Sequence, residues 1–424
     1  MKRDLAQWLA WIEGRHPKAI DMGLERVRRV AERLQLPRPA RQVITVAGTN
    51  GKGSTVAFIE AIAREQGWRT GAYTSPHLFD YGERVRIDGA PVDDGALVEA
   101  FEAVEAARAA GDAVSLTYFE YGTLAALWLF ARQPLELVVL EVGLGGRLDA
   151  TNIVDPDVAV VTTVDLDHSD WLGDDREAIG VEKAGVARAW KPLVLGEDDP
   201  PASVLRHAYT IGASAIRAGC DFFFEPVDAA RWRWREVGHE IELPYPSLRG
   251  PVQVRNAASA IAALRALDAQ VSDEAIARGV AAARVPGRLQ PFDLDGVEVV
   301  VDVGHNPQAA REVSAWLASM PAAGCTRAVL AALADKDVAG VVDALVGQVH
   351  AWHLAGLEQV PRGLDADALG ERLAGTAAAP ATRHAGVAEA LEAVRAASAD
   401  GDRILVLGSF HTAAAALGLL QGRH

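Results

Sequence analysis

A strand, a glycine-rich turn and a helix follow one another between residues 43 and 63, and this segment constrains the fold more than any other. Residues 43–54 read Val-Ile-Thr-Val-Ala-Gly-Thr-Asn-Gly-Lys-Gly-Ser, and apolar residues at helical spacing follow. Glycines let backbone N–H groups converge on phosphate oxygens, and the lysine adds a positive charge. The candidate nucleotide-binding residues of this loop are Gly48, Thr49, Asn50, Gly51, Lys52, Gly53 and Ser54.

The match to the strict P-loop pattern is imperfect. Val46 stands where the first glycine belongs, and Gly53 displaces the hydroxyl that follows the lysine to Ser54. A structural glycine turn is therefore the alternative to a phosphate-binding loop.

The composition is that of a well-packed chain with an acidic surface. Hydrophobic residues make up 50% and charged residues 23% of 424 positions, which predicts two or three domains. The net charge of −15 would repel a phosphate backbone, so we expect no nucleic-acid partner. Two cysteines are too few for a disulfide framework or a thiolate metal site. With no signal peptide or membrane span evident, we expect a cytoplasmic protein.

Short buried strands alternate with helical patterns along the first two thirds of the chain. Strands are predicted at Gln42–Val46, Leu137–Val142, Val158–Val164 and Pro192–Leu195. This alternation is typical of a doubly wound, mainly parallel sheet that is covered on both faces. Helices are predicted near Leu5–Glu13, Met22–Leu34, Asn256–Leu267 and Asp273–Ala283, and a small antiparallel addition over Phe222–Leu243.

The pattern breaks at Val285–Arg288, which we interpret as the domain boundary. We predict a P-loop α/β domain over residues 1–287 and a smaller Rossmann-like α/β domain over residues 288–424. In the second domain, strands are predicted at Val297–Val303, Ala328–Ala332 and Ile404–Leu407 and helices at Gln308–Ala318 and Val338–Val349. A cleft between two such domains is a favoured place for a site.

Polar residues follow three strands of the first domain. Glu141 ends an apolar strand, His168 lies just past the next, and Ser75 follows the strand-like segment Trp68–Tyr73. Because the carboxyl ends of parallel strands meet at the ligand crevice, these side chains are candidate ligands for Mg²⁺. The alternatives are a solvated carboxylate, a packed or surface histidine and an ordinary Ser-Pro turn.

Three more segments carry chemically useful residues with weaker local signals. Lys183 lies inside a helical pattern, where a solvated helix lysine is the default. Asp302 and His305 end the first strand of the second domain, and Ser409–Thr412 ends a later one in the same manner. A turn required by the fold is the alternative for each of these strand ends.

Taken together, these segments resemble the folylpolyglutamate synthase/dihydrofolate synthase family, which is related to the Mur peptidoglycan ligases. The resemblance runs nearly from end to end. It rests on the order of the segments Ile20–Val27, the GTNGKGS loop, Ser-Pro-His-Leu, Leu116–Thr123, Glu141–Asn152, Asp-His-Ser-Asp-Trp-Leu-Gly, Glu-Lys-Ala-Gly, Pro-Gly-Arg, His-Asn-Pro and Gly-Ser-Phe-His-Thr. The Thr117–Thr123 segment resembles the bifunctional bacterial enzymes that accept dihydropteroate as well as folates.

The resemblance implies a cytoplasmic, monomeric ligase of folate biosynthesis and one-carbon metabolism. Its small-molecule substrates would be ATP, L-glutamate, dihydropteroate and reduced folates. The carboxylate would first take the γ-phosphoryl group of ATP, and the glutamate amine would then attack the acyl phosphate. Two Mg²⁺ ions would assist, and the resemblance also admits a carbamylated Lys183 and a monovalent cation.

The resemblance further assigns roles to individual residues. Lys52, Lys183 and His305 would be catalytic. Ser54, Ser75, Glu141 and His168 would hold metal, and Gln253, Asn256, Arg288 and Asp302 would contact the nucleotide. The pterin and pteroate pocket would comprise Thr117, Phe119, Asp149, Thr151 and Asn152.

Two positions depart from the family pattern, and two other functions stay open. Gly304 replaces an alanine in Asp-x-Ala-His-Asn-Pro, where we expect it to free the backbone, and Val252 replaces a histidine before Gln253. A monofunctional folylpolyglutamate synthase would extend tetrahydrofolate without consuming dihydropteroate. A Mur-type ligase normally carries an extra N-terminal domain, for which the residues before Gln42 leave no room. A nucleotide-binding module without ligase activity is the non-enzyme alternative.

Overall fold

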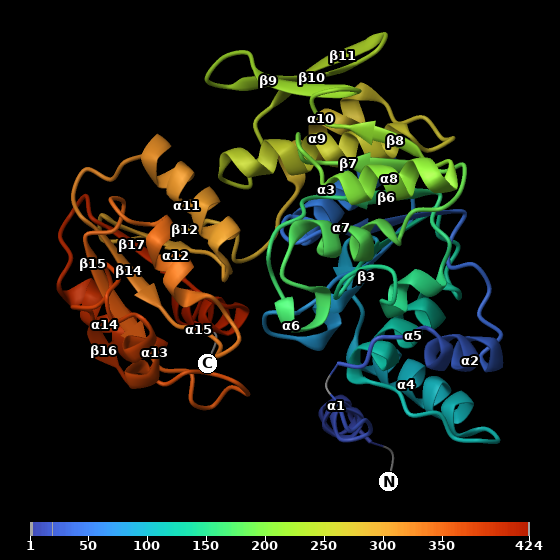
Figure 1. Ribbon diagram of the computed structural model, residues 1–424, viewed down its shortest axis with the longest axis horizontal. Helices are drawn as coiled ribbons and strands as arrows, with labels where there is room; N and C mark the ends of the chain where they lie inside the picture. The colour runs from blue at the N-terminus through green and yellow to red at the C-terminus, as the bar shows by residue number, and fades with distance from the viewer. Residues whose placement is uncertain (1–2, 19, 423–424) are drawn as a thin grey trace. The chain divides into compact units, whose positions relative to one another are not determined.

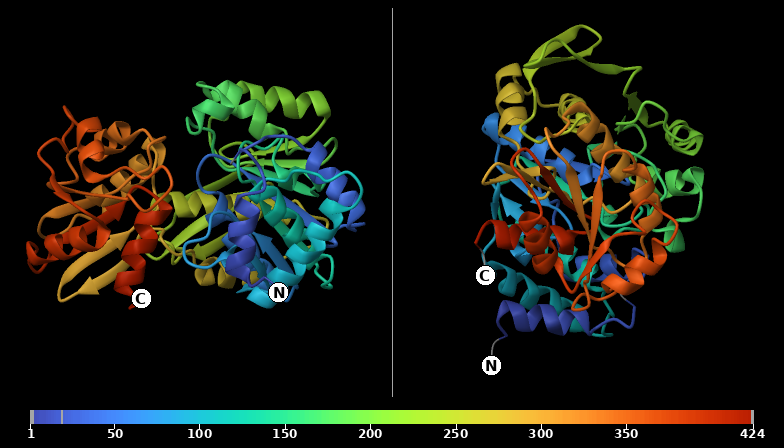
Figure 2. Two further views of the ribbon diagram at one scale, coloured as in Figure 1. Left: turned by 90° about the horizontal axis from the view of Figure 1, so that it is seen from below. Right: turned by 90° about the vertical axis from the view of Figure 1, so that its left-hand side faces the viewer.

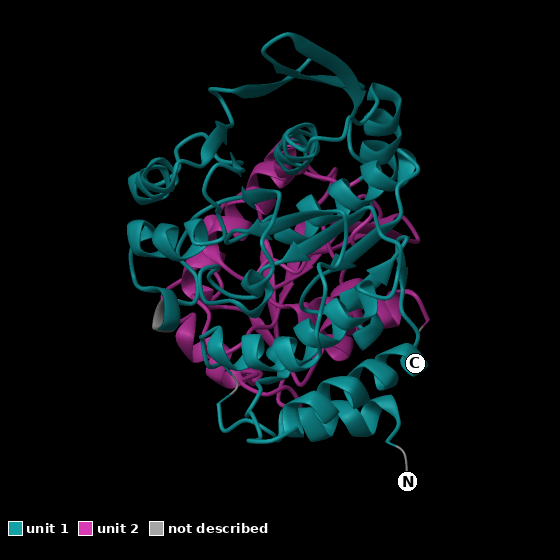
Figure 3. Cartoon of the chain, turned by 90° about the vertical axis from the view of Figure 1, so that its right-hand side faces the viewer, with its two compact units in different colours: residues 1–247, 254–283 teal, residues 248–253, 284–424 magenta. Residues whose placement is uncertain are grey.

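The strand, the glycine-rich loop and the helix predicted over residues 43–63 are present. In the computed structural model, which describes residues 3–18 and 20–422, β1 (Gln42–Ala47) is buried throughout and α3 (Lys52–Glu65) follows it after the glycine-rich loop. Such a strand needs apolar side chains on both faces, because helices cover the sheet on both sides. The described chain divides into two compact units, residues 1–247 with 254–283 and residues 248–253 with 284–424 (Figure 3).

The first unit is built on an eight-stranded sheet in which six consecutive strands are parallel (Figure 1). Across the sheet the strands are β4 (Ala90–Pro91), β3 (Val85–Ile87), β2 (Thr70–Tyr73), β5 (Leu137–Glu141), β1, β6 (Val158–Val161), β7 (Pro192–Leu195) and β8 (Ser214–Arg217). The doubly wound, mainly parallel fold is therefore confirmed. Because the strand order reverses beside β1, this point of the sheet is where such folds bind ligands.

Helices cover both faces of this sheet. One face carries α1 (Leu5–Glu13), α2 (Glu25–Arg33), α4 (Asp94–Ala109), α5 (Tyr118–Phe130), α7 (Arg176–Ala184) and α8 (Ala202–Ile211). The other face carries α3, α9 (Pro251–Arg265) and α10 (Asp273–Ala282). Short turns are η1 (Tyr81–Arg84), η2 (Ala150–Ile153) and α6 (Ser169–Leu172).

The small antiparallel addition is present as β9 (Phe222–Pro226), β10 (Arg231–Glu236) and β11 (His239–Pro244). The buried indole of Trp234 stacks near Phe222 and donates its Nε1–H to the carbonyl of Ala258 in α9. Trp234 therefore anchors the antiparallel addition on helix α9 of the first unit.

The second unit is a six-stranded sheet with helices on both faces (Figure 2). Its strands, in order across the sheet, are β12 (Gln290–Leu294), β13 (Val297–Val301), β17 (Arg403–Leu407), β14 (Thr326–Leu330), β15 (Ala351–Ala355) and β16 (Thr382–His384). Its helices are α11 (Pro307–Ser319), α12 (Val338–Ala344), α13 (Ala366–Arg372), α14 (Val387–Ala396) and α15 (Phe410–Leu420). The first three pack on one apolar cluster of the sheet.

Several predicted boundaries were wrong by a few residues. The second helix begins at Glu25 rather than Met22, because Arg26 turns back to donate to the carbonyl of Asp21. The strand predicted to reach Val164 ends at Val161, because the next residues bond to the glycine-rich loop. None of the helices in the described part of the chain combines the length and apolarity needed to cross a membrane.

Candidate functional site

The candidate residues of the first unit follow four neighbouring parallel strands. Ser75 follows β2, Glu141 ends β5, the glycine-rich loop follows β1, and His168 follows β6. All four strands run in the same direction, so their carboxyl ends lie at one edge of the sheet. This edge is the crevice at which open α/β sheets bind ligands.

The glycine-rich loop has the conformation of an anion-binding turn. Gly51 has a φ of +85° and precedes the first residue of α3, so the helix N-terminus opens toward the loop. A Cβ on Gly51 would lie 2.6 Å from Oδ1 of Asn256, which the structure thus places against the loop. The amine of Lys52 donates to the carbonyls of Gly48 (2.9 Å) and Thr49 (3.0 Å). The loop is therefore closed around its own lysine.

The loop is also bonded to the segment that follows β6. Backbone Thr49 N–H donates to the carbonyl of Thr163 (2.8 Å), and the N–H of Asn50 donates to the Thr163 hydroxyl (3.1 Å). The Thr49 hydroxyl donates to the carbonyl of Asp165 and accepts its N–H, each at 3.0 Å. The phosphate loop and the segment leading to His168 are thereby held together by side chains as well as backbone.

Glu141, Ser75 and Ser54 offer the oxygen ligands that Mg²⁺ prefers. The Glu141 carboxylate is buried, accepts the N–H of Ser75 (3.1 Å), and lies 3.7 Å from where a Cβ on Gly53 would stand. Ser54, next in the chain, is buried in the first turn of α3. Among the described residues no group of three or more His, Cys, Asp or Glu side chains forms a metal cluster. One carboxylate with two hydroxyls suits an ion that keeps several waters, so these residues fit Mg²⁺.

His168 lies in an unusual backbone conformation. Its φ is +53°, and its N–H donates to the carboxylate of Asp167 (2.9 Å). A non-glycine residue in this region is uncommon and is found mainly in turns and at functional positions. Its carbonyl accepts the N–H groups of Trp171 and Leu172, which starts the short helix α6.

Lys183 is buried near the end of α7 and is not the solvated helix lysine that its local sequence suggested. Burial, together with the charge of Lys52, lowers its pKa from 10.5 to about 7, against the opposing effect of Asp167 and Glu197. A buried amine that is partly neutral at physiological pH is nucleophilic, which is a state required for covalent modification.

The residues predicted for the pteroate pocket mostly bond within the protein. Asp149 accepts four hydrogen bonds, from the N–H groups of Gly143, Leu144 and Thr151 and from the Thr151 hydroxyl, at 2.7–3.0 Å. Burial raises the pKa of Asp149, although these donors oppose the shift. Asn152 donates to the carbonyls of Arg147 and Gly185 and accepts from Arg188. These side chains thus hold the glycine-rich turn after β5 in place.

Thr117 and Phe119 stand at the start of α5. The Thr117 side chain accepts the N–H of Glu120 (3.2 Å), and Glu120 accepts the N–H of Thr117 (2.8 Å), which forms a capping box. Phe119 packs 5.9 Å from the ring of Tyr73, and a Cβ on Gly143 would lie 2.6 Å from its ring. The ring of Phe119 therefore lies directly against the glycine-rich turn after β5.

Replacing Asp149 with asparagine is expected to destabilise the first unit by about 1–3 kcal/mol. The NH₂ group of the new amide faces either the N–H groups of Gly143 and Leu144 or the N–H of Thr151, whose hydroxyl can rotate to accept, so at least one buried N–H loses its acceptor. Urea unfolding measures the free energy of unfolding of D149N, and D155N, which changes an exposed carboxylate, is the control. Unchanged stability with a raised KM for the pteroate substrate would instead make Asp149 a substrate contact.

In the second unit, Asp302 directly follows β13 and is buried. It accepts the N–H groups of Leu289 (2.9 Å) and Gly304 (2.6 Å), and burial raises its pKa against the effect of Arg288. A Cβ on Gly304 would lie 2.8 Å from the Asp302 carboxylate. Glycine at position 304 therefore leaves room for the Asp302 carboxylate, which the Cβ of an alanine would crowd. The sequence predicted only that Gly304 would free the backbone.

Arg288 and His305 gather around one aromatic ring in the second unit. The ring of His305 lies 6.3 Å from that of Phe410, and the guanidinium of Arg288 lies 5.5 Å from the same ring. His305 also contacts the carbonyl of Val303 through Nδ1 at 3.0 Å. Phe410 belongs to the Gly-Ser-Phe-His-Thr motif, but its position beside Arg288 and His305 was not predicted from the sequence. Gln253, the remaining candidate, lies in the first turn of α9.

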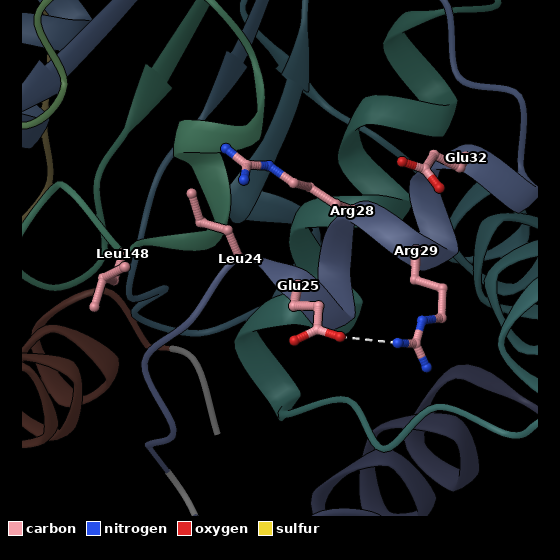
Figure 4. Close-up of a pocket in the computed structure, with 6 residues that line it drawn as sticks. All are labelled: Leu24, Glu25, Arg28, Arg29, Glu32 and Leu148. Atoms are coloured by element: carbon pink, nitrogen blue, oxygen red, sulfur yellow. Dashed lines mark hydrogen bonds and ion pairs between the residues drawn. The ribbon is translucent and has the colours of Figure 1, made fainter.

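One surface cavity of about 440 Å³ lies beside α2 and is lined by none of the predicted site residues (Figure 4). The ion pair of Arg29 and Glu25 spans 2.9 Å along its wall. The lining residues are Leu24, Glu25, Arg28, Arg29, Glu32 and Leu148.

Comparison with known proteins gives consistent matches along the chain. Residues 46–264 match the Mur ligase middle domain, and residues 287–410 match the Mur ligase glutamate ligase domain. The dihydrofolate synthase/folylpolyglutamate synthase of Escherichia coli strain K12 is 46% identical over 99% of this chain and 96% of its own. Its Haemophilus influenzae counterpart is 39% identical over 97% and 96%.

Solved structures agree with these matches. E. coli FolC in complex with DHPP and ADP has a TM-score of 0.93 at 45% identity and covers 99% of this chain and 98% of its own. A bifunctional folylpolyglutamate synthase/dihydrofolate synthase with Mn, AMPPNP and L-glutamate bound has a TM-score of 0.90 at 44% identity, with the same coverage. Mycobacterium tuberculosis folylpolyglutamate synthase with ADP and AMPPCP has a TM-score of 0.88 at 30% identity over 98% and 99%.

Proposed function

This chain belongs to the dihydrofolate synthase/folylpolyglutamate synthase family of Mur ligases, and we propose that it works as the bifunctional members do. It adds L-glutamate to dihydropteroate, giving dihydrofolate, and to reduced folates, giving folylpolyglutamates. ATP is cleaved to ADP and phosphate in each addition. The observation that carries the proposal is the meeting of a phosphate loop, a buried carboxylate and a buried lysine of lowered pKa at the carboxyl edge of one sheet.

The reaction proceeds through an acyl phosphate. A carboxylate is a poor acyl donor, so one of its oxygens attacks the γ-phosphorus of ATP and ADP leaves. The amine of glutamate then attacks the acyl carbon, and phosphate leaves from the tetrahedral intermediate while the amine loses a proton. Most of the rate enhancement in such transfers comes from positioning and charge stabilisation.

The first unit supplies the residues for phosphoryl transfer. The N–H groups of the glycine-rich loop bind the β- and γ-phosphates, and Lys52 leaves its two loop carbonyls to face the developing charge. Glu141, Ser54, Ser75 and His168 would hold two Mg²⁺ ions. Bound there, the ions neutralise phosphate charge and orient the oxygens that react.

The remaining role assignments are proposals of the same kind. Asn256 and Gln253 contact the nucleotide, as do Arg288 and Asp302 of the second unit. His305 acts near the γ-phosphate or the incoming glutamate. Phe119 stacks on the pterin, in a pocket whose turn is held by Asp149, Thr151 and Asn152, with Thr117 at the start of α5. We retain the division of roles between residues 1–287 and 288–424.

Phosphate release tests the function directly. The purified protein is given ATP, Mg²⁺ and L-glutamate with either 7,8-dihydropteroate or tetrahydrofolate. Turnover with both substrates supports the bifunctional ligase. Turnover with tetrahydrofolate alone would make it a monofunctional folylpolyglutamate synthase. Nucleotide binding without glutamate-dependent phosphate release would leave a nucleotide-binding module.

Lys183 is proposed to be carbamylated, which would turn a cation into an anionic oxygen ligand. The nitrogen of the neutral amine forms a bond to the carbon of CO₂, one C=O π bond breaks and leaves its electron pair on oxygen, and the nitrogen releases a proton to solvent. Because the pKa of Lys183 is about 7, we expect the modified fraction to rise between pH 6 and pH 8 as the neutral amine accumulates. Carbon-13 NMR in labelled bicarbonate should show a carbamate resonance that K183R lacks. Its absence at every pH in this range would exclude the modification.

The family resemblance of the sequence also supports a cellular location, an oligomeric state and a second kind of cation. We propose a cytoplasmic monomer without nucleic-acid or membrane partners, and a monovalent cation at the site. Both cysteines are free thiols, as a reducing compartment permits. Light scattering of the purified chain would measure its mass in solution.

A further inference from the structure

An ion pair outside the residues assigned above holds the backbone of Val164 on both sides. The N–H of Val164 donates to the carboxylate of Glu197 (3.1 Å), and its carbonyl accepts from Nε of Arg176 (2.8 Å). The guanidinium also reaches the second oxygen of Glu197 (3.2 Å) and the carbonyl of Asp199 (3.1 Å). Both backbone groups of Val164, in the loop after β6, are thus hydrogen-bonded to side chains that also bond to each other.

These two side chains connect three elements of the candidate site. Arg176 is the first residue of α7, the helix that carries Lys183. Glu197 follows β7, the sheet neighbour of β6. Val164 is four residues before His168, on the loop that also bonds to the phosphate loop through Thr49. The loop bearing His168 is therefore fixed from the phosphate-loop side and from the α7 side.

Stability alone does not account for this pair. The Arg176 side chain is 43% exposed, and ion pairs of such exposure contribute about 0–1 kcal/mol. The Glu197 side chain is only 12% exposed, and this burial raises its pKa to about 7 although Arg176 and the N–H of Val164 oppose the shift, so the pair is a weak source of stability at neutral pH. What the arrangement does achieve is the placement of a loop in which His168 has a φ of +53°.

We propose that Arg176 and Glu197 are positioning residues that set His168 relative to Lys183 and the phosphate loop for binding of the divalent ion. The inference rests on the proposed function, in which His168 is a ligand of that ion. Residues that orient metal ligands commonly change metal affinity or activity about 10-fold to 100-fold when they are mutated.

A double-mutant cycle on metal affinity tests the proposal. Electron paramagnetic resonance measures Mn²⁺ binding to the full chain with saturating ADP, for wild type, R176A, H168A and R176A/H168A. We expect R176A to weaken Mn²⁺ binding about 10-fold or more. In the H168A background the same change should have no further effect, because Arg176 acts through His168. R176K, which keeps one donor, should recover part of the affinity.

A matched variant and a metal-free measurement separate positioning from support of the fold. E236Q breaks the Arg265–Glu236 pair at the end of α9, a comparable ion pair of the same unit, and should leave Mn²⁺ affinity unchanged. ADP affinity without metal should also be unchanged in R176A. E197Q should weaken Mn²⁺ binding less than R176A, because glutamine keeps an acceptor for the N–H of Val164 and burial already raises the pKa of Glu197 to about 7.

The outcomes distinguish this inference from the proposed function. Wild-type Mn²⁺ affinity in R176A, or an equal loss from R176A with and without His168, would overturn the positioning role. If wild-type protein binds no Mn²⁺ beyond that held by free ADP, the metal part of the proposed function fails and the positioning role falls with it.

Discussion

Replacing Lys52 with alanine is expected to lower kcat/KM for phosphate release by about 1,000-fold or more while the fold persists. Charge stabilisation of a transferring phosphoryl group is worth about 10³–10⁵ in rate where a single cation supplies it. The amine of Lys52 bonds to the carbonyls of Gly48 and Thr49, so it already lies within the loop that would surround the phosphates. Losing these two part-buried bonds should cost little stability.

Two measurements locate the loss at the chemical step. Calorimetry should show ADP binding to K52A weakened far less than kcat/KM, because the loop N–H groups still contact the phosphates. K191A removes a half-exposed lysine that pairs with Asp157 and should behave as wild type. K52A activity within tenfold of wild type would reject the phosphate-loop interpretation.

The sequence predicted the parallel core of the fold because its strands are apolar on both faces. It missed β12, although Asp295-Gly296 is a typical two-residue hairpin turn, because Pro291 and one short polar–apolar alternation give only a weak strand signal. It also missed β15, which is short and contains His353, and β16, which has three residues. Edge strands and short strands carry too few apolar residues for periodicity to reveal them.

The candidate site was predictable to the level of segments but not of hydrogen bonds. Strand ends placed Ser75, Glu141 and His168 at one edge of the sheet, as parallel topology requires. The internal bonding of Asp149 and Asn152 depends on where a turn and a distant helix meet. The burial of Lys183 likewise depends on tertiary packing, which a helical pattern of nine residues does not encode.

Changing Glu141 to glutamine is the second substitution for which we expect a loss of about 1,000-fold or more in turnover. The carboxylate is buried at the end of β5, it accepts the N–H of Ser75, and both of its oxygens face Gly53 at the start of α3. Glutamine preserves the shape and one acceptor for Ser75 but removes the charge that would bind a divalent cation. Structural support is thus retained while metal binding is lost.

The comparison that isolates this charge is Mn²⁺ binding with and without ADP, alongside phosphate release. E141Q should bind metal-free ADP as wild type does, fail to bind Mn²⁺ tightly, and not regain full rate at high Mg²⁺. E105Q removes a part-buried carboxylate that pairs with Arg108 on α4, and it should leave both metal binding and turnover unchanged. Wild-type Mn²⁺ affinity in E141Q would mean that the divalent ion is held elsewhere. In that case Glu141 would only support the loop after β2 through its hydrogen bond to Ser75, and E141A, which removes that acceptor, would lose stability rather than turnover.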